Sequence, residues 1–312
     1  MKKYKLTYGA PAKVWLESLP LGNGRLGAMV FGDPFHERIA LNEDTLWSGY
    51  PKNNNEKGKY VFFEQARRAA MEGDVLRAQK ILDSDFAGES DESYMPLGDL
   101  FISFQGKESI RDYKRTLCLN DAVCKVSYVR GSARFERESF ISFPDDVFVT
   151  SFSCSQRKLD FDISLATQLR ATCSCKEGRL VMEGICPSHA ESNYVACEQN
   201  IFYSERREEQ GVSFCCALSV QAEDGTVTCE EDKISVRCCT RAVVRLCVKS
   251  NFEGVGTCPC DSQIDCVGSA LFALKKAGKK NYDELLRAHR QDFESLFERT
   301  EFDIGGREEE IP

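Results

Sequence analysis

The stretch Leu159-Asp160-Phe161-Asp162-Ile163-Ser164-Leu165 places an apolar residue at every second position. Successive side chains of a β-strand point to opposite faces, so this alternation predicts a strand with one face in a core and the other in solvent. Related runs surround it, among them Leu100-Phe101-Ile102-Ser103-Phe104. Residues 97–250 are therefore predicted to form antiparallel sheet.

Turn residues separate these runs. They stand at Arg130-Gly131, Pro144-Asp145, Lys176-Glu177-Gly178 and Asp224-Gly225, and the last pair predicts a two-residue hairpin because Asp-Gly favours the turn type that hairpins need. Many short strands without alternating helices indicate stacked sheets. The predicted fold class is mainly β, a large antiparallel two-sheet super-sandwich.

Helical periodicity occurs near both ends of the chain. Residues 61–86 predict two short helices joined at Glu72-Gly73, with Asp74 as the amino-terminal cap of the second. Residues 263–277 and 282–299 predict two more, and the last carries an apolar stripe that needs a partner. We therefore predict a sandwich domain over residues 1–258, with a helical insertion at 61–86, followed by a helical linker over 259–312.

Charge and hydropathy exclude two classes of partner. The net charge is −8 and basic residues form no stripe, so we expect no nucleic-acid partner. No segment approaches the roughly 20 apolar residues of a membrane helix, and no apolar run follows the basic start. We expect no membrane partner and a cytoplasmic location.

Sixteen cysteines raise the question of a disulfide framework. Cys215-Cys216 and Cys238-Cys239 are neighbours that cannot both face one partner, and other cysteines stand inside strand-like runs where Val or Ala would fit. Reduced thiols that act as small buried apolar groups are therefore expected. Structural zinc is disfavoured, because 173–175 and 258–260 leave one residue between thiols. No metal and no cofactor are expected.

Several blocks of sequence together carry a family resemblance. The two longest are Leu19-Pro20-Leu21-Gly22-Asn23-Gly24-Arg25-Leu26-Gly27-Ala28-Met29-Val30-Phe31-Gly32 and Glu37-Arg38-Ile39-Ala40-Leu41-Asn42-Glu43-Asp44-Thr45-Leu46-Trp47-Ser48-Gly49. Shorter ones lie at 94–100, 113–117, 119–122, 135–140 and 282–299. The chain resembles the amino-terminal part of glycoside hydrolase family 95, the α-L-fucosidase type, over most of its length and least over 171–261.

This resemblance implies a fold and an activity. In the family, an amino-terminal super-sandwich leads through a helical linker to an (α/α)₆ barrel that carries the chemistry. The implied reaction is inverting hydrolysis of terminal α-L-fucosides from glycans, with a glutamic acid as general acid and an Asn-assisted Asp that prepares the water. We expect the barrel and all catalytic residues to lie outside this chain, so no catalytic residue is assigned and the 312 residues alone are expected to be inactive.

Four residues after the first strands are candidates for binding substrate: Asn42, Glu43, Asp44 and Trp47. An aromatic ring can stack on a sugar face while carboxylates accept sugar hydroxyls. The alternative is that Trp47 fills a core or an interdomain contact while Asn42 and Asp44 cap a turn. The acidic pair at 145–146 and the three acidic residues at 230–232 are expected to be solvated turn charges.

Five residues are candidates for contact with the implied barrel: Arg25, Leu286, His289, Phe293 and Phe297. Arg25 either binds that partner or pairs with a nearby acid. Three functions stay open at this point. They are the non-catalytic lobe of a fucosidase, a stand-alone carbohydrate-binding or scaffolding sandwich, and a lobe of a related hydrolase for another sugar such as α-L-galactose.

Overall fold

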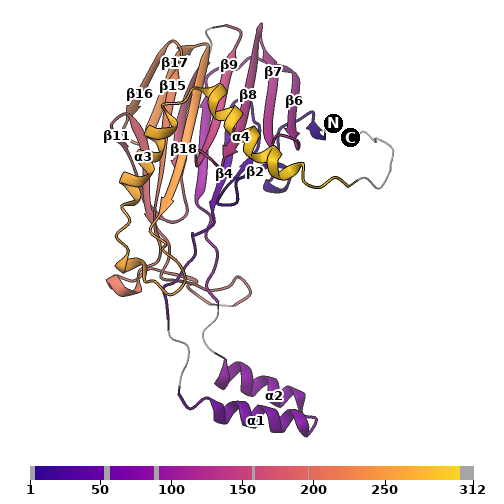
Figure 1. The fold of residues 1–312 in the computed structure, drawn as a ribbon, viewed down its shortest axis with the longest axis vertical. Helices are drawn as coiled ribbons and strands as arrows, with labels where there is room; N and C mark the ends of the chain where they lie inside the picture. The colour runs from indigo at the N-terminus through magenta and orange to yellow at the C-terminus, as the bar shows by residue number, and fades with distance from the viewer. Residues whose placement is uncertain (1–3, 53–56, 88–90, 157–158, 196, 303–312) are drawn as a thin grey trace.

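A computed structural model describes residues 4–52, 57–87, 91–156, 159–195 and 197–302. As predicted, the protein is mainly β, with two large antiparallel sheets that face each other (Figure 1). Within these residues no helix is both long and apolar enough to cross a membrane.

The larger sheet has nine described strands. Their spatial order is β1-β6-β7-β8-β9-β18-β15-β12-β11. Their bounds are β1 Lys5–Tyr8, β6 Ile110–Cys118, β7 Val123–Arg130, β8 Ala133–Ser142, β9 Val147–Cys154, β18 Arg241–Ser250, β15 Ser213–Ala222, β12 Arg179–Ile185 and β11 Arg170–Lys176. The turns predicted between β7 and β8, β8 and β9, and β11 and β12 are confirmed as hairpins.

The smaller sheet has seven described strands in the order β16-β17-β10-β5-β4-β3-β2. They are β16 Thr226–Glu230, β17 Lys233–Cys239, β10 Leu159–Ala166, β5 Gly98–Phe104, β4 His36–Glu43, β3 Leu26–Val30 and β2 Leu19–Gly22. A two-stranded ribbon, β13 His189–Ala190 with β14 Ile201–Phe202, lies apart from both sheets.

The main core lies between the two sheets. Three phenylalanines from both layers meet there, with ring centroids 5.6 Å apart for Phe104 and Phe152 and 5.2 Å for each of them with Phe161. A buried ion pair between Glu37 and Arg137 also crosses the core, and the guanidinium lies over the rings of Phe104 and Phe152. Aromatic packing and one neutralised charge pair thus join the layers.

Two helices cover the outer face of the nine-stranded sheet. They are α3, Cys266–Ala277, and α4, Tyr282–Phe297 (Figure 1). Asp265 caps α3 and a capping box of Asn281 and Glu284 begins α4. Their buried residues share a second core with β8, β9, β15 and β18. Because both faces of β9 are covered, almost every residue of that strand is buried.

The predicted helical insertion forms a separate pair. Helix α1 spans Tyr60–Met71 and α2 spans Val75–Ile81, continued by a single wide turn to Phe86. Asp74 caps α2 by accepting a hydrogen bond from Arg77 N at 3.0 Å, as predicted. The pair packs on its own small cluster of alanines and extends away from the sheets (Figure 1).

One predicted hairpin is wrong. Strands β15 and β16, on either side of Asp224-Gly225, belong to different sheets. Gly225 has φ +81°, and Asp224 Oδ1 accepts hydrogen bonds from Thr240 N at 2.7 Å and Thr240 Oγ1 at 3.0 Å. The turn therefore carries the chain from one sheet to the other. Its Asp224 is bound by Thr240, which lies in a different segment.

The cysteine prediction is wrong for one pair. Cys175 and Cys229 form a disulfide that joins β11 to β16 and thus links the edge strands of the two sheets. Of the other fourteen cysteines, seven are buried. Small apolar packing thus accounts for those seven, while the disulfide closes one open side of the sandwich.

Candidate functional site

The segment after β4 is fastened to the segment before β5. Ser48 N donates to Ser93 O at 2.9 Å, and Met95 N donates to Leu46 O at 2.9 Å. Trp47 lies between these contacts, in an isolated bridge with Tyr94. Two chain segments about fifty residues apart therefore hold Trp47 in a defined place.

Trp47 is fixed but accessible. Its ring meets that of Tyr94 edge to face at a centroid distance of 5.5 Å, and its Nε1–H donates to Asp44 O at 3.2 Å. The side chain nevertheless stays 47% exposed. The alternative of a core position for Trp47 is therefore excluded in this chain.

Trp47 lines a pocket of about 370 Å³. The pocket walls come from four parts of the chain: Thr45, Trp47, Ser48, Gly49, Tyr50 and Pro51; Glu92; Val212; and Phe252, Gly254, Val255, Gly256, Thr257 and Pro259. Three aromatic rings and one carboxylate thus face a space the size of a small ligand. Such rings can cover the C–H face of a sugar while the carboxylate accepts its hydroxyls.

Glu92 is the charged group of this pocket. Its carboxylate accepts hydrogen bonds from Ser48 Oγ at 2.6 Å, His189 Nδ1 at 3.0 Å and Ala190 N at 3.3 Å, and Lys52 Nζ lies 3.4 Å away. Burial alone would raise the pKa of Glu92, but the hydrogen bonds from Ser48 and His189 outweigh it and lower the pKa. Glu92 is therefore held as a carboxylate.

His189 joins Glu92 to a second acid. Its Nε2 lies 3.0 Å from Glu191 Oε1, on the opposite side of the ring from Glu92. Hydrogen bonds to Glu191 and Glu92 raise the pKa of His189. The structure thus gives this histidine two carboxylate partners.

The predicted substrate-binding residues separate in the structure. Glu43 is buried at 1% exposure and bonds to Arg25 and to Thr45, so its carboxylate is already occupied. Asp44 is exposed, and Asn42 lies beside a different pocket of about 310 Å³ with Trp15 and Asp99. Among the four, Trp47 alone lines the aromatic pocket.

Arg25 pairs with acids, the second of the two alternatives. Its Nη1 lies 2.9 Å from Glu43 Oε1 and its Nε donates to Asp146 Oδ1 at 3.1 Å. Asp146 also contacts Lys249. The prediction that the acidic pair at 145–146 is solvated is wrong for Asp145, which is only 6% exposed and contacts Lys280. Asp146 stays 29% exposed and shares its carboxylate between Arg25 and Lys249.

The stripe on α4 divides between two environments. Leu286 and His289 are buried against the sandwich, and His289 Nε2 donates to Asp121 O at 2.8 Å. Leu296 is 54% and Phe297 is 38% exposed. Phe293 and Leu296 line a groove of about 520 Å³ with Phe143, Gly22, Asn23, Gly24, Ile141, His289 and Asp292. This outer half of the stripe still lacks a partner within the described residues.

Sequence analysis missed Tyr50, Glu92 and Phe252. Tyr50 directly follows a block that carried the family resemblance, and Glu92 lies two residues before another. Phe252 lies in the weakly matched region, with no local signal. Only the folded chain brings these three segments together.

Two stacked antiparallel sheets with helices on one outer face and a loop-built aromatic pocket define a β-sandwich domain. The chain belongs to the family described as "Glycosyl hydrolase family 65, N-terminal domain", whose model matches residues 6–255.

The curated relatives that match this chain are named as fucosidases. The chain is 31% identical to Alpha-L-fucosidase 2 of Arabidopsis thaliana, over 97% of this chain and 37% of the relative. It is 28% identical to a protein named "Probable alpha-fucosidase A" of Aspergillus oryzae, over 53% of this chain and 24% of the relative. The same name in Aspergillus niger gives 23% identity over 94% of this chain and 38% of the relative. The chain thus spans less than two fifths of each relative.

A solved structure supports the fold alone. A protein of the human microbiome named as a kojibiose phosphorylase superposes with a TM-score of 0.51 at 10% identity, over 94% of this chain and 38% of that chain. The predicted resemblance to the amino-terminal domain of a fucosidase-like glycoside hydrolase is confirmed by the family match and the plant relative.

Proposed function

We propose that this chain is the non-catalytic amino-terminal lobe of an inverting α-L-fucosidase of the family 95 type, and that its Trp47 pocket contacts the glycan. The observation that carries the proposal is the pocket itself, with Trp47, Tyr50 and Phe252 around the ionised Glu92. The names of the curated relatives support α-L-fucosides as the substrate class.

The residues that line the pocket support a role in sugar binding and not in catalysis. Inverting hydrolysis needs two carboxyl groups about 6.5–9.5 Å apart across the scissile bond. Among the described residues that line the pocket, Glu92 is the one carboxylate. The pocket can hold and orient a sugar, while the general acid and base are proposed to come from an (α/α)₆ barrel.

The groove at Phe143, Phe293 and Leu296 supports a partner domain. Phe143 is 62% and Leu296 is 54% exposed, and both line one concave apolar surface. Isolated apolar residues on a surface are common, but a lined groove of this kind is typical of a contact site. We propose that the barrel covers it.

A turnover assay tests whether this chain alone is catalytically inactive. The purified chain, incubated with an aryl α-L-fucoside, is expected to release no aryl alcohol above a buffer blank. Release that scales with protein concentration and disappears in Glu92→Gln would contradict the proposal, because it would place catalysis in this pocket. Glu136→Gln, a change at an exposed carboxylate, serves as the matched control.

A second candidate is a stand-alone carbohydrate-binding sandwich. The pocket at Trp47 would serve that function equally well, so the groove on α4 discriminates between the two. If Leu296→Lys improves the solubility of the chain without changing sugar affinity, the groove is a contact surface and the lobe assignment is favoured. If the wild-type chain is already monodisperse at high concentration by light scattering, the stand-alone module is favoured.

A further inference from the structure

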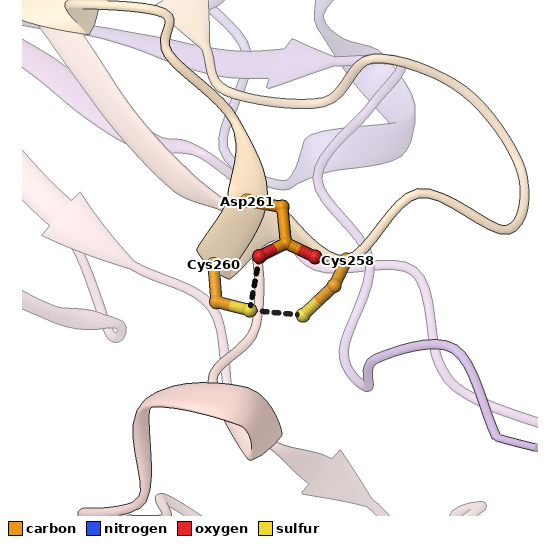
Figure 2. A group of neighbouring side chains, drawn as sticks. All are labelled: Cys258, Cys260 and Asp261. Carbon is orange, nitrogen blue, oxygen red and sulfur yellow. Dashed lines mark hydrogen bonds between the residues drawn. The ribbon is translucent and has the colours of Figure 1, made fainter.

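Two cysteines and an aspartate meet beside the wall of the pocket. Cys258-Pro259-Cys260-Asp261 forms one tight 3₁₀ turn over Pro259–Asp261, and Figure 2 shows the two sulfur atoms close together with the carboxylate beside Cys260. The sulfur atoms lie 2.7 Å apart, and Cys260 Sγ lies 3.5 Å from Asp261 Oδ1. One donor atom from each residue lies within 4.8 Å of the other two.

Contacts from two other segments hold this turn. Asn251 Nδ2 donates to Pro259 O at 3.0 Å, and Arg207 Nη2 donates to Cys260 O at 2.7 Å. The thiol of Cys258 lies 3.6 Å from the carbonyl oxygen of Glu208. The backbone that carries the three donors is thus positioned by its surroundings, and a carbonyl oxygen lies close to them.

Access and charge both suit a cation. Cys258 and Cys260 are partly exposed and Asp261 is exposed, so an ion can reach all three from solvent. Among the described residues, no lysine or arginine forms an ion pair with Asp261. Elsewhere in the described part of the chain, no other three His, Cys, Asp or Glu side chains converge in this way.

We propose that Cys258, Cys260 and Asp261 bind one thiophilic divalent cation of the zinc class. Two thiolates and a carboxylate supply three ligands, and water completes the coordination, as in open zinc sites. The thiols release their protons to solvent when the ion binds. The one-residue spacing that disfavours a closed four-ligand zinc site leaves this open arrangement possible.

The required movement is small. Zinc–sulfur bonds of about 2.3 Å in tetrahedral geometry place two sulfur atoms roughly 3.8 Å apart. The sulfur atoms must therefore separate by about 1 Å, which rotation of a partly exposed cysteine side chain can supply. Since Thr257 and Pro259 line the Trp47 pocket, a bound ion would also fix one of its walls.

The test uses the full chain in which Cys175 and Cys229 are both changed to serine, reduced and desalted without oxygen, and Cd²⁺ alone as the probe. Thiolate-to-metal charge-transfer absorption, measured against a competing chelator, is expected to report one tight equivalent. Cys258→Ser and Cys260→Ser should each weaken that equivalent on the order of 100-fold, and Asp261→Asn about tenfold. Cys197→Ser, a change at an exposed cysteine outside the turn, should leave it intact.

A second readout keeps the test independent of spectroscopy. One equivalent of Zn²⁺ should raise the melting temperature of the wild-type chain and leave that of Cys258→Ser unchanged. Tight Cd²⁺ binding that survives in both serine variants would overturn the proposal. Recovery of the 258–260 peptide as an internal disulfide after the same anaerobic treatment would also overturn it.

Discussion

At the scale of single residues, one ion pair lies buried in the core between the sheets. Glu37 is fully buried, and its Oε1 accepts hydrogen bonds from Phe31 N at 3.1 Å and Gly32 N at 2.9 Å. Its other oxygen meets Arg137, which is 3% exposed. Because both groups are removed from water, each charge is tolerable only while the other is present.

Replacing Glu37 should therefore destabilise the protein strongly. Glu37→Gln leaves the guanidinium of Arg137 buried without a counter-charge and is expected to lower the free energy of unfolding by about 3–5 kcal/mol. Urea denaturation followed by circular dichroism measures this. Glu136→Gln removes the exposed pair with Arg134 and should change stability by less than about 1 kcal/mol. Equal losses in the two variants would refute the role of burial.

The pKa values of two histidines should be shifted in opposite directions. Hydrogen bonds to Glu191 and Glu92 raise the pKa of His189, whereas burial lowers the pKa of His289 against the opposing backbone hydrogen bond at Asp121. The chain has three histidines, so imidazole signals in an NMR titration can be assigned with His189→Gln and His289→Gln. His289 protonating at a higher pH than His189 would contradict the structure.

These shifts also fix the sign of the pH dependence. The raised pKa of His189 stabilises the folded state below the unfolded-state value of about 6.5, and this contribution is lost as the pH rises through the folded-state pKa. The lowered pKa of His289 does the reverse, because the unfolded chain then binds a proton more readily as the pH falls below about 6.5. Stability in His189→Gln should therefore decline less on raising the pH from 6 to 8 than in the wild type.

At the scale of elements, α4 is part of the folded body. Leu285 is fully buried under it, whereas Leu296, three turns further along the same helix, is 54% exposed. Leu285→Ala should lower the free energy of unfolding by about 2–5 kcal/mol, and Leu296→Ala should have little effect. Similar small effects from both changes would show that α4 does not pack on the sheet.

The disulfide should stabilise the sandwich at its open side. Cys175 and Cys229 are 54 residues apart in sequence, and a cross-link of that span is expected to contribute about 2–4 kcal/mol. A reductant should lower the melting temperature of the wild type by several degrees and leave that of Cys175→Ser/Cys229→Ser unchanged. The comparison of the two proteins isolates the effect of the disulfide, because the fourteen other cysteines meet the same reductant in both. Equal losses of melting temperature would contradict the prediction.

Local sequence predicted the elements better than their connections. Alternation identified the strands, and Asp74 identified a helix start, because both signals arise within a few residues. The Asp224-Gly225 turn was misassigned because turn chemistry does not specify which sheet receives the next strand. Asp145 was misassigned for a similar reason, since its partner Lys280 lies 135 residues away.

At the scale of the whole molecule, the sandwich positions loops from distant parts of the chain at one pocket. Sequence analysis selected Trp47 but not Glu92 or Phe252, which reach the pocket only when both sheets are assembled. It also expected the whole α4 stripe to await a partner, whereas the nine-stranded sheet itself covers Leu286 and His289. The family resemblance predicted the architecture, whereas packing determines which residues stay exposed to a ligand or a partner domain.

The most direct test of this account is tryptophan fluorescence. The chain has two tryptophans, so Trp15→Phe leaves Trp47 as the sole reporter. Adding an oligosaccharide with a terminal α-L-fucosyl residue to this variant should shift the emission saturably, and Trp47→Phe, which retains Trp15, should show no such shift. An emission from Trp47 that stays constant up to the solubility limit of the sugar would contradict the proposal that this pocket contacts the glycan.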